Sequence, residues 1–395
     1  MIRRPLRRGA RTHACSVHTR VNAFWHSRAI SKRQAYFVTV LIFPIDSPPP
    51  VKVSVHLMPI CGSAETGQLG VRHLKRLWSR QMAARAGQAN GGPDPAEWVA
   101  SQTLICGLGL GLHETLQYLI GAEPTFDRFE QWVLEKNGGS IEPARIARIN
   151  AALSGDAVAA APPDMVAGGP PLTPEDLSFW EENGYVILHH AVPPENCEAA
   201  ARAIYEFTGA DPANPQTWYR QPQGHSIWIP LLHHPALCAN RQSARIHRAF
   251  AQLWGRDDMW ATVDQGGFNP PERPGWSFPG PFLHWDVSLA RPIPFGVQGI
   301  LYLTDTDANQ GAFTCVPGFH RRIESWLSGL PPGVNPRELN LYELGPAPIA
   351  GKAGDLIIWH QALPHGSSPN CAARPRVVQY LSMRPSRWEY RETWK

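Results

Sequence analysis

The sequence has few cysteines, and none of them form a recognisable pair. Seven cysteines are scattered over 395 residues without a CxxC spacing, so neither a disulfide framework nor a zinc knuckle is predicted. Long apolar runs are also missing. The longest, residues 36–45, is about half as long as the ~20 residues that a membrane-spanning helix needs. These absences predict a cytoplasmic protein with reduced thiols.

Acidic residues are absent from the beginning of the chain, where Asp46 is the first. The arginine-rich residues 1–65 are therefore predicted to be a disordered basic arm, although an organelle transit peptide has a similar composition. A translation start at Met58 or Met82 is another alternative. The whole chain has 37 basic and 33 acidic residues, so without the arm it is near neutral or slightly acidic. This balance argues against nucleic-acid and membrane-surface partners and favours a small-molecule substrate.

Residues 66–156 are predicted to be a small helical domain, because apolar residues recur at three- and four-residue steps from Leu69 to Trp78. Three or four helices fit this stretch. Their boundaries are indicated by Pro95, by Pro124 with Thr125, and by Gly138 with Gly139. The alternating Gly107, Gly109 and Gly111 lack the spacing and the strand-turn-helix setting of a dinucleotide-binding loop, so they predict helix packing instead.

Residues 157–171 are rich in alanine, proline and glycine and are predicted to be a linker. The second domain, residues 172–395, opens with a helix that is capped by Thr173 and stopped at Gly184, and a strand over residues 185–188 follows. Further on, short apolar runs alternate with turn residues, as is typical of antiparallel strands. These runs cover residues 297–303, 312–316, 355–359 and 376–383. The pattern predicts a mainly β fold with helices, an antiparallel sandwich or jelly roll.

His284 and Asp286 stand two residues apart, so both side chains leave the same face if the segment is extended. One further histidine from a distant strand would complete a set of two imidazoles and one carboxylate. Such a set leaves adjacent coordination positions open, which suits Fe(II) that binds a chelating cosubstrate and O2 together. The HxD pair alone is also compatible with an ordinary surface or core histidine.

Several motifs follow one another in this order: His284-Trp285-Asp286, Asn309-Gln310-Gly311, Pro317-Gly318-Phe319-His320, His365-Gly366-Ser367, and Arg376. Together they resemble the pattern of the phytanoyl-CoA dioxygenase family of Fe(II)/2-oxoglutarate oxygenases. The resemblance covers about residues 172–385 and implies a double-stranded β-helix, which is a cupin-like jelly roll. It does not cover the helical domain.

The resemblance implies that His284, Asp286 and His365 bind the iron and that Arg376 anchors the distal carboxylate of 2-oxoglutarate. A guanidinium suits this role because its planar fork pairs bidentately with a carboxylate. Ser367 could donate a hydrogen bond to the same carboxylate. Two residues compete for these assignments: His360 with His365, and Arg374 with Arg376.

The chain departs from the family at the strand after HxD, where many members have a tryptophan. Gln298 or Tyr302 is expected to replace the contact of that tryptophan with the cosubstrate. Aromatic and basic residues between positions 218 and 228 lie where the family varies its substrate lid, and either substrate contact or packing explains them.

The expected reaction is hydroxylation of a small organic substrate, with conversion of 2-oxoglutarate and O2 to succinate and CO2. Asp286 favours hydroxylation over halogenation, because related halogenases lack this carboxylate. The main alternative is a catalytically silent metal-binding jelly roll with a helical partner-docking region, and a cupin with another metal and no cosubstrate is a third possibility. The substrate and the oligomeric state stay open.

Overall fold

The computed structural model describes residues 59–88, 94–155, 163–220 and 226–391, and most of the predicted basic arm lies outside these ranges. All the described residues belong to one compact unit, Lys52–Lys395. No helix in the described part of the chain has both the length and the apolar character that a membrane span requires.

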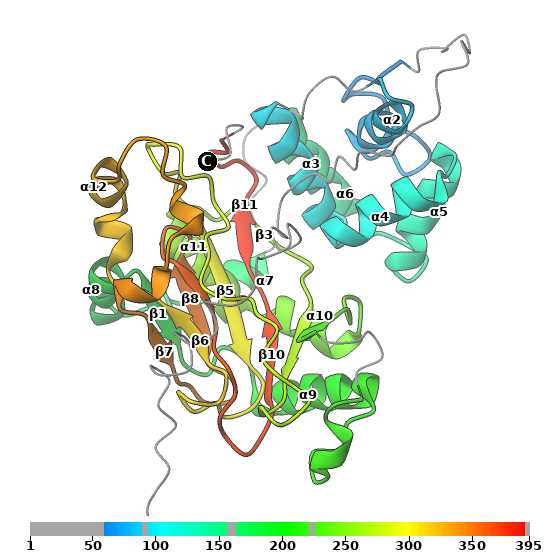
Figure 1. The fold of residues 1–395 in the computed structure, drawn as a ribbon. Coiled ribbons are helices and arrows are strands. Elements are labelled where there is room, and N and C mark those ends of the chain that lie inside the picture. Colours follow the sequence, from blue (N-terminus) through cyan, green and yellow to red (C-terminus); the bar gives the residue numbers. More distant parts are fainter. Residues whose placement is uncertain (1–58, 89–93, 156–162, 221–225, 392–395) are drawn as a thin grey trace, which may run out of the picture. The chain divides into compact units, whose positions relative to one another are not determined.

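The region predicted to be helical contains five helices among its described residues, rather than three or four (Figure 1). These are α2 (Leu74–Arg85), α3 (Pro95–Gly107), α4 (Leu112–Ala122), α5 (Phe126–Lys136) and α6 (Pro143–Ser154). The count differs because α3 and α4 are joined by a very short turn, which the sequence pattern does not separate. In this turn Gly109 has a φ of +64°, and Gly111 is the N-cap residue of α4. This turn is where the alternating glycines lie. Asp94 and Thr125 cap α3 and α5 through their side chains.

The start of the second domain follows local sequence rules. Helix α8 (Pro174–Asn183) opens with a capping box between Thr173 and Asp176, and it ends at Gly184, whose φ is +74°. Strand β1 (Tyr185–Leu188) follows at once. The predicted linker contains a short helix, α7 (Pro163–Val166).

The remaining elements are short strands and helices. The helical ones are α9 (Pro194–Thr208), η1 (Pro215–Thr217), α10 (Pro235–Arg241), α11 (Ala244–Trp254), η2 (Phe319–Arg321), α12 (Ile323–Ser328), η3 (Pro336–Glu338) and η4 (Leu341–Leu344). The strands are β2 (Trp228–Ile229), β3 (Met259–Ala261), β4 (Gly266–Asn269), β5 (Val297–Tyr302), β6 (Phe313–Cys315), β7 (Ala347–Ile349), β8 (Leu356–His360), β9 (His365–Ser367), β10 (Arg376–Tyr380) and β11 (Met383–Pro385).

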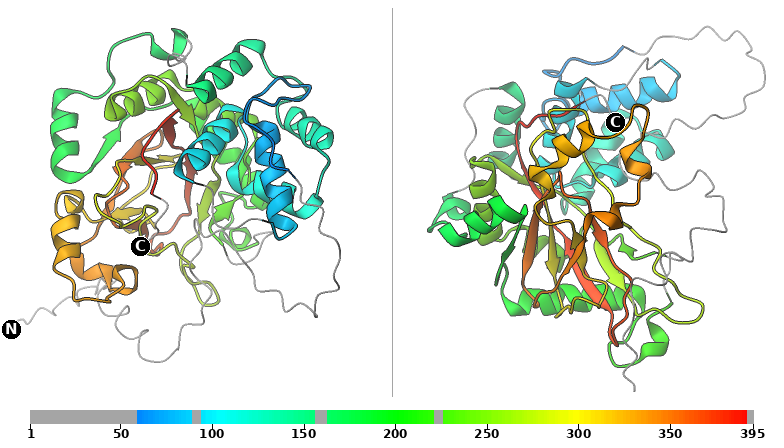
Figure 2. Two further views of the ribbon diagram at one scale, coloured as in Figure 1. Left: turned by 90° about the horizontal axis from the view of Figure 1, so that it is seen from above. Right: turned by 60° about the vertical axis from the view of Figure 1, so that its left-hand side comes forward.

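The strands form an antiparallel jelly roll, which confirms the predicted fold class. One sheet has the order β1-β8-β5-β10-β4-β2, and a smaller sheet has the order β7-β6-β9 (Figure 1). Consecutive side chains of the larger sheet alternate between two hydrophobic clusters. Leu356 and Ile358 of β8 join the cluster that packs on α9 and α11, whereas Ile357 and Trp359 face the smaller sheet. Figure 2 shows the large sheet and its green helices from two further sides.

The strand predicted over residues 376–383 is in fact two strands, because the chain changes partners in its middle. Leu381 still donates to the carbonyl of Gly299 in β5, but Ser382 exchanges hydrogen bonds with Thr262. The chain thereby passes from the six-stranded sheet into the separate β11–β3 pair.

Candidate metal and cosubstrate site

A single antiparallel bridge joins the two halves of the candidate site. The N–H of His284 donates to the carbonyl of His365 at 2.9 Å, and the N–H of His365 donates to the carbonyl of His284 at 3.0 Å. His365 begins β9, but the HxD segment does not form a strand, because the chain bends at Asp286.

Gly366 explains why the segment after His365 approaches the HxD segment so closely. A Cβ atom at this position would lie 2.7 Å from the carbonyl oxygen of Phe282 and 2.9 Å from that of Pro281. Both neighbours are backbone atoms, so they cannot move aside as a flexible side chain can. Only glycine fits here without displacing the bridge that sets the two histidines.

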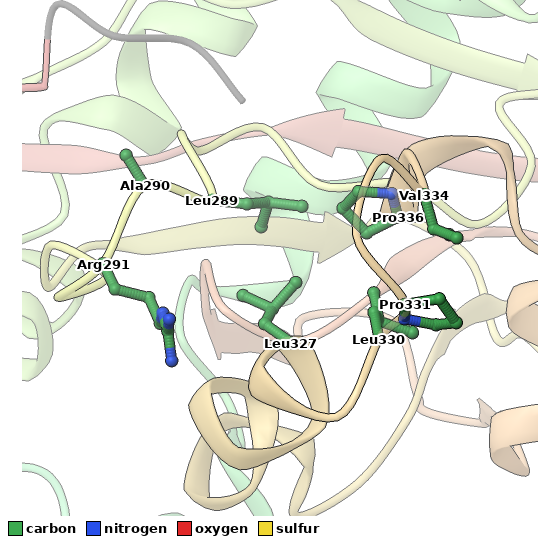
Figure 3. Close-up of a pocket in the computed structure, with 8 residues that line it drawn as sticks. All are labelled: Leu289, Ala290, Arg291, Leu327, Leu330, Pro331, Val334 and Pro336. Carbon is green, nitrogen blue, oxygen red and sulfur yellow. The ribbon is translucent and has the colours of Figure 1, made fainter.

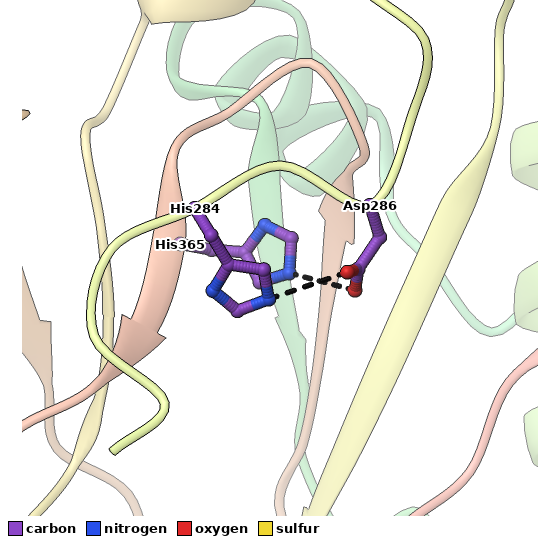
Figure 4. A group of neighbouring side chains, drawn as sticks. All are labelled: His284, Asp286 and His365. Carbon is purple, nitrogen blue, oxygen red and sulfur yellow. Dashed lines mark ion pairs between the residues drawn. The ribbon is translucent and has the colours of Figure 1, made fainter. Parts of the chain in front are cut away.

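The side chains of His284, Asp286 and His365 converge on one point (Figure 4). One ligand atom from each lies within 4.8 Å of the other two. Asp286 Oδ1 is 3.3 Å from Nε2 of His284, and Asp286 Oδ2 is 3.4 Å from Nε2 of His365. His365 is buried, whereas the other two side chains remain 32% and 22% exposed, so the group is open on one side.

Backbone carbonyls select the imidazole tautomers. Nδ1 of His284 donates to the carbonyl of Phe282 at 2.7 Å, and Nδ1 of His365 donates to that of Leu363 at 3.0 Å. With the proton on Nδ1, each Nε2 keeps its lone pair and directs it at the shared centre. This arrangement of outer hydrogen bonds is common for histidines that bind metals.

Burial and charge set the protonation states of the three groups. Burial would raise the pKa of Asp286, but the two imidazoles hold it well below its usual range. Burial lowers the pKa of His365. Burial acts in the same direction on His284, but the neighbouring carboxylate outweighs it and raises the pKa of that imidazole. An ionised carboxylate beside imidazoles that can lose their protons is a donor set for a divalent cation.

Arg376 is a fully buried cation at the start of β10. Its Nη1 donates to Oγ of Ser367 at 2.8 Å, while Nε and Nη2 have no hydrogen-bond partner among the described residues. Ser367 lies two residues after His365 on β9, so both side chains leave the same face. A buried guanidinium with unsatisfied donors is costly unless an anion pairs with it. The arrangement therefore fits a carboxylate ligand.

The turn before β10 is braced by two amide side chains. Asn370 donates from Nδ2 to a β4 carbonyl and to the carbonyl of Arg374, both at 2.8 Å. Gln310 donates from Nε2 to the carbonyl of Pro375 at 3.0 Å. These contacts fix the turn with the side chain of Arg376 inside and that of Arg374 exposed.

His360, the rival of His365, is not part of the converging group within the described chain. Its Nδ1 accepts a hydrogen bond from the N–H of Ala362 at 3.0 Å, and its ring lies 5.4 Å from that of His320. Burial lowers the pKa of His360 to about 4. This histidine is therefore neutral and engaged with the chain itself.

Gln298 and Tyr302, the predicted substitutes for the family tryptophan, have different surroundings. Gln298 donates from Nε2 to Asp286 Oδ2 at 2.9 Å, and its Oε1 is buried without a partner among the described residues. The hydroxyl of Tyr302 donates to the carbonyl of Ile349 at 2.7 Å and accepts from the N–H of Phe313 at 3.0 Å. Gln298 thus reaches the candidate ligands, whereas the hydroxyl of Tyr302 is already engaged.

One feature near the site has no clear signal in the sequence. Arg337 donates to the carbonyls of Trp285 and Val287, which are chain neighbours of Asp286. Because every residue has a carbonyl, no residue type marks the partner of such an arginine. Trp228, one of the aromatic residues between positions 218 and 228, packs in a tilted arrangement on Tyr380 of β10, with the ring centroids 4.6 Å apart.

Known proteins are similar to the part of the chain that contains these residues. The family model described as phytanoyl-CoA dioxygenase matches residues 180–378, which include the converging group, Ser367 and Arg376. A putative phytanoyl-CoA dioxygenase of Dictyostelium discoideum is 21% identical over 260 residues, or 53% of this chain and 74% of the relative. An ectoine dioxygenase of Bordetella bronchiseptica is 23% identical over 235 residues, with the same two coverages.

Solved structures resemble the chain more distantly. EctD from S. alaskensis with bound Fe has a TM-score of 0.42 and 19% identity, and the match covers 57% of this chain and 82% of EctD. The carbocyclase SnoK from nogalamycin biosynthesis has a TM-score of 0.39 and 18% identity, with coverages of 57% and 90%.

Proposed function

Because the chain belongs to the phytanoyl-CoA dioxygenase family of Fe(II)/2-oxoglutarate-dependent oxygenases, we propose that it hydroxylates a small organic molecule. In this reaction 2-oxoglutarate, O2 and a substrate C–H group become succinate, CO2 and an alcohol. The oxygenase domain corresponds to residues 172–395, and the helical residues 66–156 precede it.

One observation carries the proposal: β9 links the converging triad to a buried cation with unsatisfied donors, because it carries both His365 and the Ser367 that Arg376 contacts. His365 and Ser367 project from the same face of β9, and Ser367 contacts Arg376. A ligand that chelates a metal at one end and has a carboxylate at the other matches this pair of features. 2-Oxoglutarate has this chemistry.

Each residue has a defined part in the proposed site. His284, Asp286 and His365 hold the iron through two nitrogens and one oxygen, which leaves adjacent coordination positions free. When bound, the iron supplies the activation of O2 that couples decarboxylation of 2-oxoglutarate to oxidation of the substrate. Arg376 and Ser367 orient the cosubstrate by its distal carboxylate.

Gln298 and Asp286 bear on whether the site hydroxylates or halogenates its substrate. The amide of Gln298 holds Oδ2 of Asp286, so one carboxylate oxygen is restrained and the other can face the metal. Because Asp286 fills the third protein position, a halide has no vacant place among the protein ligands. This favours hydroxylation over halogenation.

The decisive experiment measures succinate formation by anaerobically purified protein supplied with Fe(II), 2-oxoglutarate and O2. Slow uncoupled turnover is expected without substrate, and a metabolite screen should find compounds that stimulate it. An iron-loaded protein that binds no 2-oxoglutarate and forms no succinate would instead favour the silent metal-binding module. The His365→Ala variant, which should not bind iron, serves as the negative control.

A further inference from the structure

The backbone that carries Asp286 lies outside the regular hydrogen-bond network of the sheets. The bridge to β9 fixes His284, but the chain bends at Asp286, beyond that bridge. The preceding side chain is held separately, since Nε1 of Trp285 donates to the carbonyl of Ala362 at 3.0 Å. Gln298 holds the carboxylate itself, so the remaining question is what holds the peptide groups on either side of Asp286.

Arg337 supplies contacts on both sides of that residue. Its Nη1 is 2.8 Å from the carbonyl oxygen of Trp285, and its Nη2 is 2.5 Å from that of Val287. One planar guanidinium therefore spans the carbonyls that flank Asp286. The arginine is itself held, because its N–H donates to Oδ1 of Asn335 at 3.1 Å in the turn that opens η3.

The segments on either side of Arg337 pack against the HxD loop, since Trp285, Val287 and Leu289 share a hydrophobic cluster with Leu341 and with the partly buried Leu327. Between the HxD loop and the segment before Arg337 lies a hollow of about 190 Å³ (Figure 3). It is lined by Leu289, Ala290 and Arg291 on one side and by Leu327, Leu330, Pro331, Val334 and Pro336 on the other. The paired hydrogen bonds of Arg337 add a polar link that reaches the two carbonyls flanking Asp286.

We propose that Arg337 is a positioning residue that fixes the direction of the Asp286 carboxylate by clamping the carbonyls of Trp285 and Val287. This inference rests on the proposed function, in which Asp286 binds the iron. Arg337 touches neither the metal nor the cosubstrate in this role. Its effect passes through the backbone of the ligand.

The charge of Arg337 and its proposed positioning role predict opposite effects on metal affinity when this residue is replaced. A cation near the site repels a metal ion, so on charge alone the neutral Arg337→Gln variant binds metal more tightly. Loss of the clamp weakens binding, because outer contacts of metal ligands typically contribute about 10–100-fold in affinity. Arg337→Lys keeps the charge but lacks the planar fork that spans two carbonyls.

The test is a Co²⁺ titration of the metal-free full chain, followed by the visible absorption of the bound ion. We expect Arg337→Gln and Arg337→Lys to raise the Kd for Co²⁺ by about 10–100-fold. With metal saturating, the affinity for 2-oxoglutarate should change little, because Arg376 anchors it. Melting curves check that each variant is folded.

Arg241 offers a matched control, because it also donates to two backbone carbonyls; it is buried, whereas Arg337 is half-buried. Its Nη1 and Nη2 donate to Leu232 and Asp264, both at 2.7 Å, and it is not part of the metal group. Arg241→Lys and Arg241→Gln should therefore keep the wild-type Kd for Co²⁺, even if they melt earlier.

Three outcomes overturn the inference: unchanged affinity in Arg337→Lys, tighter binding in Arg337→Gln, or equal weakening in the Arg241 variants. Failure of the proposed function looks different. In that case the wild-type protein binds Co²⁺ no better than His365→Ala. There is then no metal site for Arg337 to position.

Discussion

Replacing Arg376 by glutamine removes the cation that is proposed to anchor 2-oxoglutarate. In the protein alone, this guanidinium is fully buried and only one of its nitrogens, Nη1, has a partner among the described residues, Oγ of Ser367. Its charge is therefore poorly compensated until an anion binds. We expect Arg376→Gln to leave the stability of the ligand-free protein unchanged or to increase it, because an unpaired buried charge disappears.

Arg376→Gln should, by contrast, weaken the binding of 2-oxoglutarate. Truncating one partner of a buried charge pair costs about 2–5 kcal/mol. Since each 1.4 kcal/mol is about tenfold in affinity, the KM for 2-oxoglutarate should rise by roughly 30-fold to several-thousand-fold. Binding of iron should change little, because other residues make the metal site.

Two assays measure this prediction independently. The first follows succinate formation against 2-oxoglutarate concentration, with iron content determined in parallel. The second follows thermal unfolding: a ligand at 100 times its Kd stabilises the wild-type protein by about 2.7 kcal/mol. After a 100-fold loss of affinity, the same concentration contributes only about 0.4 kcal/mol.

Arg374→Gln is the matched control, since Arg374 is two residues away and exposed. It should retain the wild-type KM and the stabilisation by 2-oxoglutarate. An unchanged KM in Arg376→Gln would refute the anchor assignment. If both variants lost affinity equally, the effect would be one of long-range charge and the buried pair would not be its cause.

Further substitutions separate the roles of the other site residues. His365→Ala should abolish iron binding and turnover, because only two protein ligands remain. His360→Ala should retain much activity. The reverse result would exchange the roles of the two histidines. Gln298→Leu should weaken metal binding by about 10-fold or more, through loss of its contact with a ligand, with iron affinity as the measurement. Tyr302→Phe should cost about 1–3 kcal/mol in urea unfolding, because two buried backbone groups lose their partner. Deletion of residues 1–57 should preserve folding and succinate formation, and loss of soluble protein would contradict this.

Much of the fold was predictable because its determinants are local. Thr173 and Gly184 mark the ends of α8, since a side-chain cap and a left-handed residue act within a few positions of the chain. The alternation in β8 likewise decides which residues face each cluster, because neighbouring side chains of a strand point to opposite faces. Helix number was less predictable, since the turn at Gly109 is too short to separate two apolar patterns.

The sequence by itself also determined the chemistry of the candidate site. The spacing of His365 and Ser367 places an imidazole and a hydroxyl on one face of a strand, and the order of motifs identified Arg376 as the candidate anchor. These features depend on residue type and on short spacings, which a sequence displays directly.

Only the tertiary structure decided how these groups meet. The bridge from His284 to β9 and the hydrogen bonds of Arg337 to the carbonyls of Trp285 and Val287 join segments that are distant in the chain. Their partners are mostly backbone carbonyls and N–H groups, which are alike at every position. Apart from Gly366, whose missing side chain permits the close approach at the bridge, residue identity does not indicate these contacts, and the folded chain specifies them.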